Sequence, residues 1–371
     1  MELKGLIPEV QQETHPGLPH WKYGTIENNK KIIDPLLHYG CFTLGFDRND
    51  IINHVCEQLK NIKPEIAESA VPTGDTLRLN HASYELADRI YILSNGYRSF
   101  YALSGSDANE GAVKLASAYH HQKGNAHKNL IVSFENSYHG STFLTINLGA
   151  DNLMKDPFYT MPKYHGVKRI NRQFNYVPQD WDNVSCIVVE TCSYGNDMTP
   201  NSTEFWNKLT RIQQDHDVIL IMDDIFIGGG KTGNYIGWKH LPINPDISTM
   251  GKAITAGTFP LSMVLYNEKI HNVLPKNFRW EHGFTYNYSM PGILSALKYL
   301  DILEQEKILD QHDEIVTQAE QIIKSSGFEI VNRFGLLFMI RKKEYQMMYI
   351  IPVNANSEYF EVLKNNLMEI K

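Results

Sequence analysis

Lys252 and a pair of carboxylates, Asp223 and Asp224, carry the chemistry that this sequence suggests first. Lys252 follows the strand-like run 247–250 among apolar and small residues. Burial there would lower the pKa of its amine and make it a candidate Schiff-base nucleophile, whereas a lysine directed to solvent is the ordinary alternative. The two carboxylates end the apolar run 219–222, and burying them is costly unless a partner offsets their charge. A protonated heteroaromatic nitrogen, a metal ion or a helix N-terminus could be that partner.

Two further segments have residue types that suit an anion and a planar ring. In the segment Ser104–Glu110 (SGSDANE) a predicted strand turns into a predicted helix. Gly105 permits close backbone approach, Ser106 or Asp107 can cap the helix, and the free amides of its first turn suit a phosphate. Tyr138-His139-Gly140 follows another strand-like run and could offer a ring face to a planar cofactor. A capped helix start and an aromatic packed on a loop are the purely structural alternatives.

One glycine-rich segment argues against a nucleotide-hydrolysing enzyme. The run Gly228–Thr232 ends like a phosphate-binding P-loop, but that motif needs a glycine at position 225, which is Ile225 here.

These residues would be positioned by an α/β sheet. Strand-like runs alternate with amphipathic windows, a pattern typical of right-handed crossovers and a mainly parallel sheet with the chemistry beyond its carboxyl edge. The predicted strands are Ser99–Leu103, Leu130–Phe134, Ser185–Glu190, Val218–Asp223, Ile247–Met250 and Leu261–Tyr266, and helices are predicted at Asp107–His121 and Ser202–His216.

The two ends of the chain have a different pattern, which predicts a second, smaller domain. We predict an N-terminal segment, 1–49, that belongs to this small domain, a large cofactor-binding α/β domain at 50–290, and a C-terminal part of the small α+β domain at 291–371. Within the last part we expect helices at 292–308, 311–325 and 357–370 and a strand at 335–340.

Composition excludes several classes of partner. The 371 residues include 35 Lys and Arg against 42 Asp and Glu, a formal charge of −7, which argues against nucleic acid or an anionic membrane as the main partner. No apolar run approaches the ~20 residues of a membrane span, and the polar start is no signal peptide, so we predict a cytoplasmic protein. No metal-binding spacing occurs, and the cysteines form no Cys-x-x-Cys pair; they are Cys41, Cys56, Cys186 and Cys192.

Together, the order and surroundings of these segments resemble the class III (ω-) aminotransferases, pyridoxal 5'-phosphate (PLP) enzymes of fold type I. The resemblance runs from about Asp34 to Arg341. It implies that Gly105 and Ser106 bind the cofactor phosphate and that Tyr138, of the aromatic-His-Gly step that includes His139, stacks on the pyridine ring.

The resemblance also implies roles for the remaining site residues. Asp223 would pair with the pyridine nitrogen, Ile225 would pack on the opposite ring face, and Lys252 would form the Schiff base. The stretch His282–Tyr286 resembles one whose threonine, here Thr285, reaches the phosphate of the neighbouring subunit, which implies a homodimer with shared active sites.

The chain departs from the family in ways that concern the substrate. The usual Val-Glu-Pro is Val189-Glu190-Thr191, and both the N-terminal segment and the C-terminal domain are short for the family. The usual arginine for the substrate carboxylate therefore cannot be assigned from the sequence; Arg333 or Arg341 could substitute, or could have a surface or strand-edge role.

The resemblance predicts transfer of an amino group from an amine donor to an oxo acid or aldehyde. Within the class it favours the adenosylmethionine-8-amino-7-oxononanoate type, with an ω-amino-acid:pyruvate type nearly as close. The alternatives are an aminomutase of the glutamate-1-semialdehyde kind, a racemase, or a PLP-binding protein that has lost catalysis.

Overall fold

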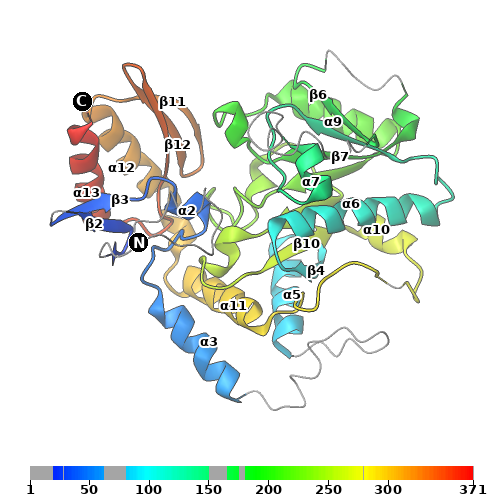
Figure 1. The fold of residues 1–371 in the computed structure, drawn as a ribbon, viewed down its shortest axis with the longest axis horizontal. Helices are drawn as coiled ribbons and strands as arrows, with labels where there is room; N and C mark the ends of the chain where they lie inside the picture. Colours follow the sequence, from blue (N-terminus) through cyan, green and yellow to red (C-terminus); the bar gives the residue numbers. More distant parts are fainter. Residues whose placement is uncertain are drawn as a thin grey trace, which may run out of the picture.

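A seven-stranded sheet forms the centre of the larger domain (Figure 1). The computed structural model describes residues 20–27, 29–61, 81–149, 165–174, 180–278 and 280–370, so residues 1–19 of the predicted N-terminal segment lie outside the described residues. The strands are β4 (Arg98–Ala102), β5 (Leu130–Phe134), β6 (Val167–Ile170), β7 (Val184–Glu190), β8 (Ile219–Asp223), β9 (Ile247–Met250) and β10 (Ser262–Tyr266). Their order is β4-β10-β9-β8-β7-β5-β6. Only β10 runs antiparallel to its neighbours, so the predicted mainly parallel sheet is confirmed.

Alternate residues of the strands pack into two separate hydrophobic cores, one on each face of the sheet. In β7, Ile187 and Val189 belong to one core and Cys186 and Val188 to the other. This alternation is the two-residue period of a strand buried on both faces. The first core includes helices α5 (His81–Leu93), α9 (Thr203–Asp215) and α11 (Met290–Gln305), and the second includes α6 (Gly105–Gln122), α7 (Phe143–Leu148) and α10 (Glu268–Val273). The domain therefore has the three layers expected for its class.

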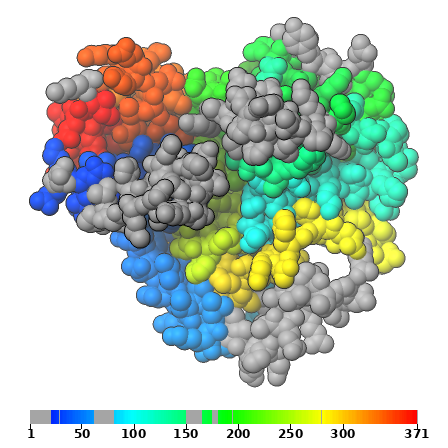
Figure 2. Space-filling view, in the orientation of Figure 1, coloured from blue at the N-terminus to red at the C-terminus, as the bar shows by residue number. Residues whose placement is uncertain are grey.

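The smaller domain is built from both ends of the described chain. The N-terminal part supplies the antiparallel strands β1 (His20–Trp21), β2 (Gly24–Glu27) and β3 (Lys30–Ile33). The C-terminal part supplies α12 (His312–Ser325), the antiparallel strands β11 (Glu329–Phe334), β12 (Leu337–Lys342) and β13 (Tyr345–Ile350), and α13 (Ser357–Glu369). Strand β3 lies along α13, where the Ile33 amide donates to Asn366 Oδ1 at 2.8 Å. In Figure 2 the blue and red surfaces adjoin at this place, and the predicted α+β domain from both termini is confirmed.

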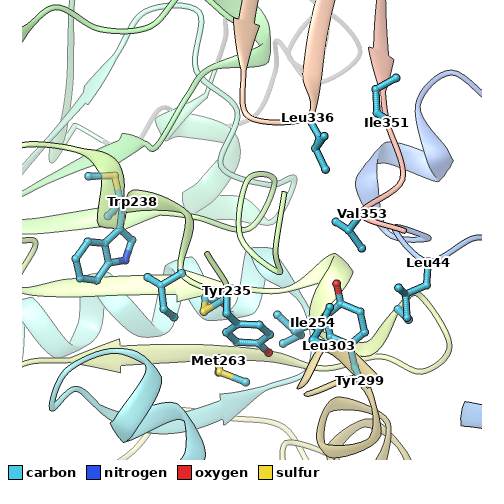
Figure 3. Close-up of a cluster of buried hydrophobic side chains, with 14 of the residues drawn as sticks. Leu44, Tyr235, Trp238, Ile254, Met263, Tyr299, Leu303, Leu336, Ile351 and Val353 are labelled. Carbon is cyan, nitrogen blue, oxygen red and sulfur yellow. The ribbon is translucent and has the colours of Figure 1, made fainter. Parts of the chain in front are cut away.

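Side chains from both domains meet in one apolar cluster (Figure 3). Tyr299 of α11 lies at its centre, and its hydroxyl donates to the Gly229 carbonyl at 2.6 Å and contacts Thr43 Oγ1 at 3.2 Å. The Val353 amide in turn donates to the Thr43 carbonyl at 3.0 Å. These contacts fix the position of the small domain against the large one. The boundaries at 49/50 and 290/291 stay predictions.

The remaining short elements connect these parts. They are α2 (Leu37–Gly40), α3 (Asn49–Asn61), η3 (Trp181–Asn183), η4 (Tyr194–Asn196), η5 (Gly237–His240), η6 (Lys252–Thr255) and η7 (Ile308–Gln311). Within the described part of the chain, no helix has the length and apolar character needed to cross a bilayer. The four cysteines are unpaired.

Candidate active site

Three neighbouring strands bring the predicted chemical residues to one edge of the large sheet. At the carboxyl ends of β7, β8 and β9, Glu190 lies in register with Asp223, and Asp223 with Thr249. Lys252 follows Thr249 by three residues. Because parallel strands end at the same edge, segments far apart in the sequence converge here.

The Asp223 carboxylate is buried and held by three donors. Its Oδ2 atom accepts hydrogen bonds from His139 Nδ1 and Asn109 Nδ2, both at 2.8 Å, and its Oδ1 atom accepts the Ile225 amide at 3.1 Å. Asn109 is itself fixed, because its Oδ1 atom accepts Thr249 Oγ1 at 2.8 Å. A buried carboxylate fixed in this way is prepared to pair with a protonated nitrogen. The described residues include no group of three His, Cys, Asp or Glu side chains that could hold a metal ion.

The N-terminus of α6 lies against the residues that follow β8. A Cβ atom on Gly105 would lie 2.9 Å from Ile225 Cδ1, and one on Gly140 would lie 2.2 Å from Ser106 Oγ. The Ser141 amide donates to that Ser106 hydroxyl at 3.2 Å. Gly140, whose φ is +122°, has no room for a side chain, and a Cβ at Gly105 would require the end of the Ile225 side chain to move, so both glycines allow close packing around the start of the helix.

The start of α6 corrects one detail of the sequence analysis. Ser106 and Asp107 were expected as caps of a helix beginning at Asp107, but the helix begins at Gly105 and its cap is Ser104, whose Oγ accepts the Asp107 amide at 3.3 Å. Ser104 has the extended backbone that a capping residue needs. The hydroxyl of Ser106 is therefore not used as the cap.

Lys252 has an unusual backbone and an unpaired amine. Its φ is +51°, a left-handed conformation that is costly for a residue with a side chain. Its Nζ lies 4.6 Å from the centre of the Phe226 ring, and among the described residues nothing hydrogen-bonds to it. Burial lowers the pKa of Lys252, although the charges of Asp223 and Glu190 oppose this shift. A lowered pKa leaves more of the amine neutral and nucleophilic.

Glu190 is buried beside this site and is incompletely paired. Among the described residues its Oε2 atom has no hydrogen-bond partner, and Arg172 Nη2 lies 3.9 Å away. Burial raises the pKa of Glu190, and the charges of His139 and Arg172 reduce the shift.

Two predicted residues lie at the surface of the protein. The Tyr138 side chain is 47% exposed, and its phenol feels the charge of Asp223, which places it on the rim of the site. Thr285 is exposed and makes no hydrogen bond to the other predicted site residues. Its predicted role in a neighbouring subunit stays a prediction.

Asp224 and Lys231 serve the interior of the fold. Asp224 accepts Thr191 Oγ1 at 2.6 Å and the Gly237 amide at 2.7 Å, and burial raises its pKa to about 7. Lys231, in the glycine-rich segment, is fully buried and donates to the Gly228 carbonyl at 2.7 Å, while burial lowers its pKa to about 7.

Asn109, Thr249 and Arg172 were not singled out from the sequence. Asn109 follows Gly105 by four residues in the same helix, so helical spacing could have placed it near the strand ends. No sequence pattern pointed to Thr249 or Arg172. Thr249 reaches the site through the register of β9, and Arg172 through a contact made by the segment that follows β6.

The site fits a ring that carries an anionic group and a protonatable nitrogen. The anion would lie at the glycine-lined start of α6, and the nitrogen would face Asp223. His139 Nε2 is buried and, within the described residues, lacks a hydrogen-bond partner.

Comparisons with known proteins identify the family of the chain. A family model described as Aminotransferase class-III matches residues 22–348. The acetylornithine/succinyldiaminopimelate aminotransferase of Buchnera aphidicola subsp. Acyrthosiphon pisum (strain APS) is 30% identical over 293 residues, covering 78% of this chain and 69% of the relative. The succinylornithine transaminase of Salmonella typhi is 28% identical over 294 residues, covering 77% of this chain and 70% of the relative.

The fold has solved counterparts. An amine transaminase from an uncultivated Pseudomonas species, solved in its PLP-bound form, superposes with a TM-score of 0.76 over 91% of this chain and 90% of the other, at 17% sequence identity. At that identity the likeness is one of fold.

Proposed function

Because the chain belongs to the class-III aminotransferases, which use PLP, we propose that it transfers the terminal amino group of an acylated ornithine-type amino acid to an oxo acid. One observation carries the proposal: the buried Asp223 carboxylate, fixed by His139 and Asn109, lies at the same sheet edge as the left-handed Lys252.

PLP bound at this site would supply an electron sink for the charge that develops on the amine-bearing carbon. The residues present fit it. The amides at the start of α6, with Gly105 and Ser106, would hold the phosphate. Asp223 would keep the ring nitrogen protonated, because an adjacent negative charge raises the pKa of that nitrogen. Ile225 and Tyr138 would flank the two ring faces.

Lys252 would hold the cofactor covalently between turnovers and move a proton during them. Burial lowers the pKa of its amine, so the neutral form needed to accept a proton is accessible. Its Nζ would take the proton from the amine-bearing carbon of the substrate and return it to the carbon on the other side of the amine nitrogen, a 1,3 transfer. The absence of hydrogen bonds to Nζ from the described residues leaves the amine free to turn between these positions.

The named relatives guide the choice of donor. Two act, by their names, on acetylornithine or succinyldiaminopimelate and on succinylornithine. These compounds share a terminal amine, an acylated second nitrogen and a carboxylate. We therefore favour such a donor over the adenosylmethionine-8-amino-7-oxononanoate and ω-amino-acid:pyruvate types predicted from the sequence.

A homodimer and a cytoplasmic location are also part of the proposal. Exposed aromatic side chains support the dimer, because Phe284 and Tyr286, beside Thr285, are 53% and 70% exposed in this protomer. Light scattering of the holoenzyme tests it, and a monomer at micromolar concentration would contradict shared active sites.

The activity is tested with purified holoenzyme, N-acetylornithine or N-succinylornithine as donor, and 2-oxoglutarate or pyruvate as acceptor. We expect the visible band of the cofactor to change on adding donor alone and to recover on adding acceptor, with one aldehyde formed per amino acid. Isomerised donor without an acceptor would instead indicate an aminomutase. A band that no amine perturbs would overturn the assignment as an active transaminase.

A further inference from the structure

The amine of Lys252 lies against the face of an aromatic ring. Its Nζ atom is 4.6 Å from the centre of the Phe226 ring, and among the described residues no group hydrogen-bonds to it. A cation within about 6 Å of a ring centre is attracted by the negative face of the ring, more strongly where water is excluded, whereas a neutral amine is not. The Phe226 ring therefore favours the protonated form of Lys252 without fixing it in one orientation.

The turn that follows β8 fixes the position of this ring from one side. The Ile225 amide, next to Phe226, donates to Asp223 Oδ1 at 3.1 Å and ties the turn to the buried carboxylate of the site. A Cβ atom on Gly229 would lie 2.6 Å from Ala253 Cβ, so the same turn packs directly on η6. The contact between Phe226 and Lys252 thus joins two segments that are already packed together.

An apolar cluster shared by both domains fixes the ring from the other side. Phe226 packs against this cluster, whose members are Leu37, Cys192, Met198, Ile227, Leu337, Met339, Met348 and Ile350. A Cβ atom on Gly40 would lie 3.6 Å from Phe226 Cε2. Because the neighbours of the ring are close-packed, its face stays directed at the Lys252 amine.

The proposed reaction makes Lys252 a cation for part of each turnover. Its amine takes a proton from the amine-bearing carbon of the substrate and holds it before returning it to the second carbon. A buried cation is costly unless a nearby group stabilises it. The Asp223 carboxylate would by then be paired with the ring nitrogen of the cofactor. The Phe226 face is a stabilising contact that depends on neither cofactor nor substrate.

We propose that Phe226 is a positioning residue for the proton transfer, whose ring face holds the Lys252 ammonium between removal of the proton and its return. This inference rests on the proposed transaminase function and deepens it. The first C–H bond breaks as an N–H bond forms on Lys252, and its electron pair is taken up by the bound cofactor. An N–H bond then breaks as that electron pair forms the second C–H bond, and Lys252 ends neutral. Since attraction to a ring face is not a directed hydrogen bond, the ammonium can turn between the two carbons.

Ring fluorination tests this role while keeping the packing. Each fluorine withdraws electron density from the ring face and weakens its attraction for a cation, and the shape of the side chain changes little. Phenylalanines with increasing numbers of ring fluorines are introduced at position 226 of the full chain. The same residues at position 334 are the matched control, because Phe334 of β11 packs against the same apolar cluster.

The first readout is the pKa of the Lys252 amine in the apoenzyme, measured as the pH dependence of its labelling by acetic anhydride and read by mass spectrometry. We expect this pKa to fall step by step as fluorines are added at position 226, because the cation loses stabilisation. The same residues at position 334 should leave it unchanged. A constant pKa across the series at position 226 would overturn the role of Phe226.

The second readout is the kinetics of the holoenzyme with N-acetylornithine and 2-oxoglutarate. In Phe226→Leu we expect kcat to fall on the order of 3- to 30-fold with little change in KM, because the ring contact acts after the donor has bound. Phe334→Leu should leave both quantities unaffected. A loss carried by KM alone, or an equal loss in Phe334→Leu, would contradict the inference.

The outcomes separate the inference from the proposed function. If Phe226→Leu does not fold, the fluorinated series, which keeps the ring, decides alone. Wild-type enzyme that converts no donor would overturn the proposed function, whereas labelling of Lys252 in the apoenzyme would still test Phe226.

Discussion

Replacing Asn109 with alanine probes the network that fixes Asp223. Asn109 is 1% exposed, and its amide nitrogen donates to both Asp223 Oδ2 and the His139 carbonyl at 2.8 Å, while its oxygen accepts Thr249 Oγ1 at 2.8 Å. In Asn109→Ala all three hydrogen bonds are lost. The His139 carbonyl and the Thr249 hydroxyl are then left buried without a replacement partner.

The magnitude follows from these three bonds. A hydrogen bond to a charged group contributes about 1.5–3 kcal/mol, and leaving a buried neutral donor or acceptor unsatisfied costs about 1–3 kcal/mol. Summed over one charged and two neutral partners, we expect the free energy of unfolding to fall by roughly 3.5–9 kcal/mol. We also expect kcat/KM to fall on the order of 10- to 100-fold, because the Asp223 carboxylate then loses one of its three donors and is held less firmly.

Urea denaturation of apo- and holoenzyme measures the first quantity, and steady-state kinetics with N-acetylornithine the second. Asn332→Ala is the control, since the half-buried Asn332 also donates two hydrogen bonds, to the Asp197 carbonyl and to Thr199 Oγ1, and both are solvent-exposed. It should change stability by less than about 0.5 kcal/mol. The reasoning would be refuted if Asn109→Ala matched Asn332→Ala in stability and wild type in kcat/KM.

Three further changes test other parts of the site. Lys252→Ala should abolish turnover and the covalent linkage detected by mass spectrometry after borohydride reduction, with an unchanged circular dichroism spectrum; normal activity would contradict its assignment. Gly105→Ala should weaken PLP binding on the order of 10-fold in titrations of the apoenzyme, because the new Cβ would lie 2.9 Å from Ile225 Cδ1; unchanged affinity would mean that Ile225 yields. Burial lowers the pKa of Lys231 from 10.5 to about 7, so the unfolded chain binds a proton that the folded chain releases and stability rises with pH between these values. Between pH 8 and 9.5 the wild type should gain about 2 kcal/mol relative to Lys231→Met in urea denaturation, and parallel curves would show that Lys231 is protonated in the fold.

The central strands could be predicted from the sequence because each is an apolar run buried on both faces. Leu130–Phe134 and Ile247–Met250 match β5 and β9 at both ends, and the others differ by a residue. Strand β6 was missed because its sequence, Val-Lys-Arg-Ile, carries two basic residues, which an edge strand tolerates. The predicted strand at 335–340 begins at Leu337, since Gly335 has a φ of +58° and belongs to the turn before it.

The residues of the candidate site that directly follow strand ends could be predicted from the sequence. Asp223, His139 and Lys252 could be named because a parallel sheet places such residues together. Asn109 lies 114 residues from its partner Asp223, and no local pattern encodes which side chain of a helix faces a given strand. The Arg172–Glu190 pair is likewise a product of tertiary packing.

The contact between β3 and α13 can form only after almost the whole described chain has been synthesised. The Lys30–Glu369 contact spans 339 residues, and Ile33 binds Asn366 in the same place. At the ribosome's pace of about 5–20 residues per second, the first strands wait roughly 20–70 s for the helix that covers them. During that time the large domain can complete its sheet, whereas the nascent β1–β3 segment remains uncovered. Chaperones should therefore have access to β1–β3 for longer than to any other described part of the chain.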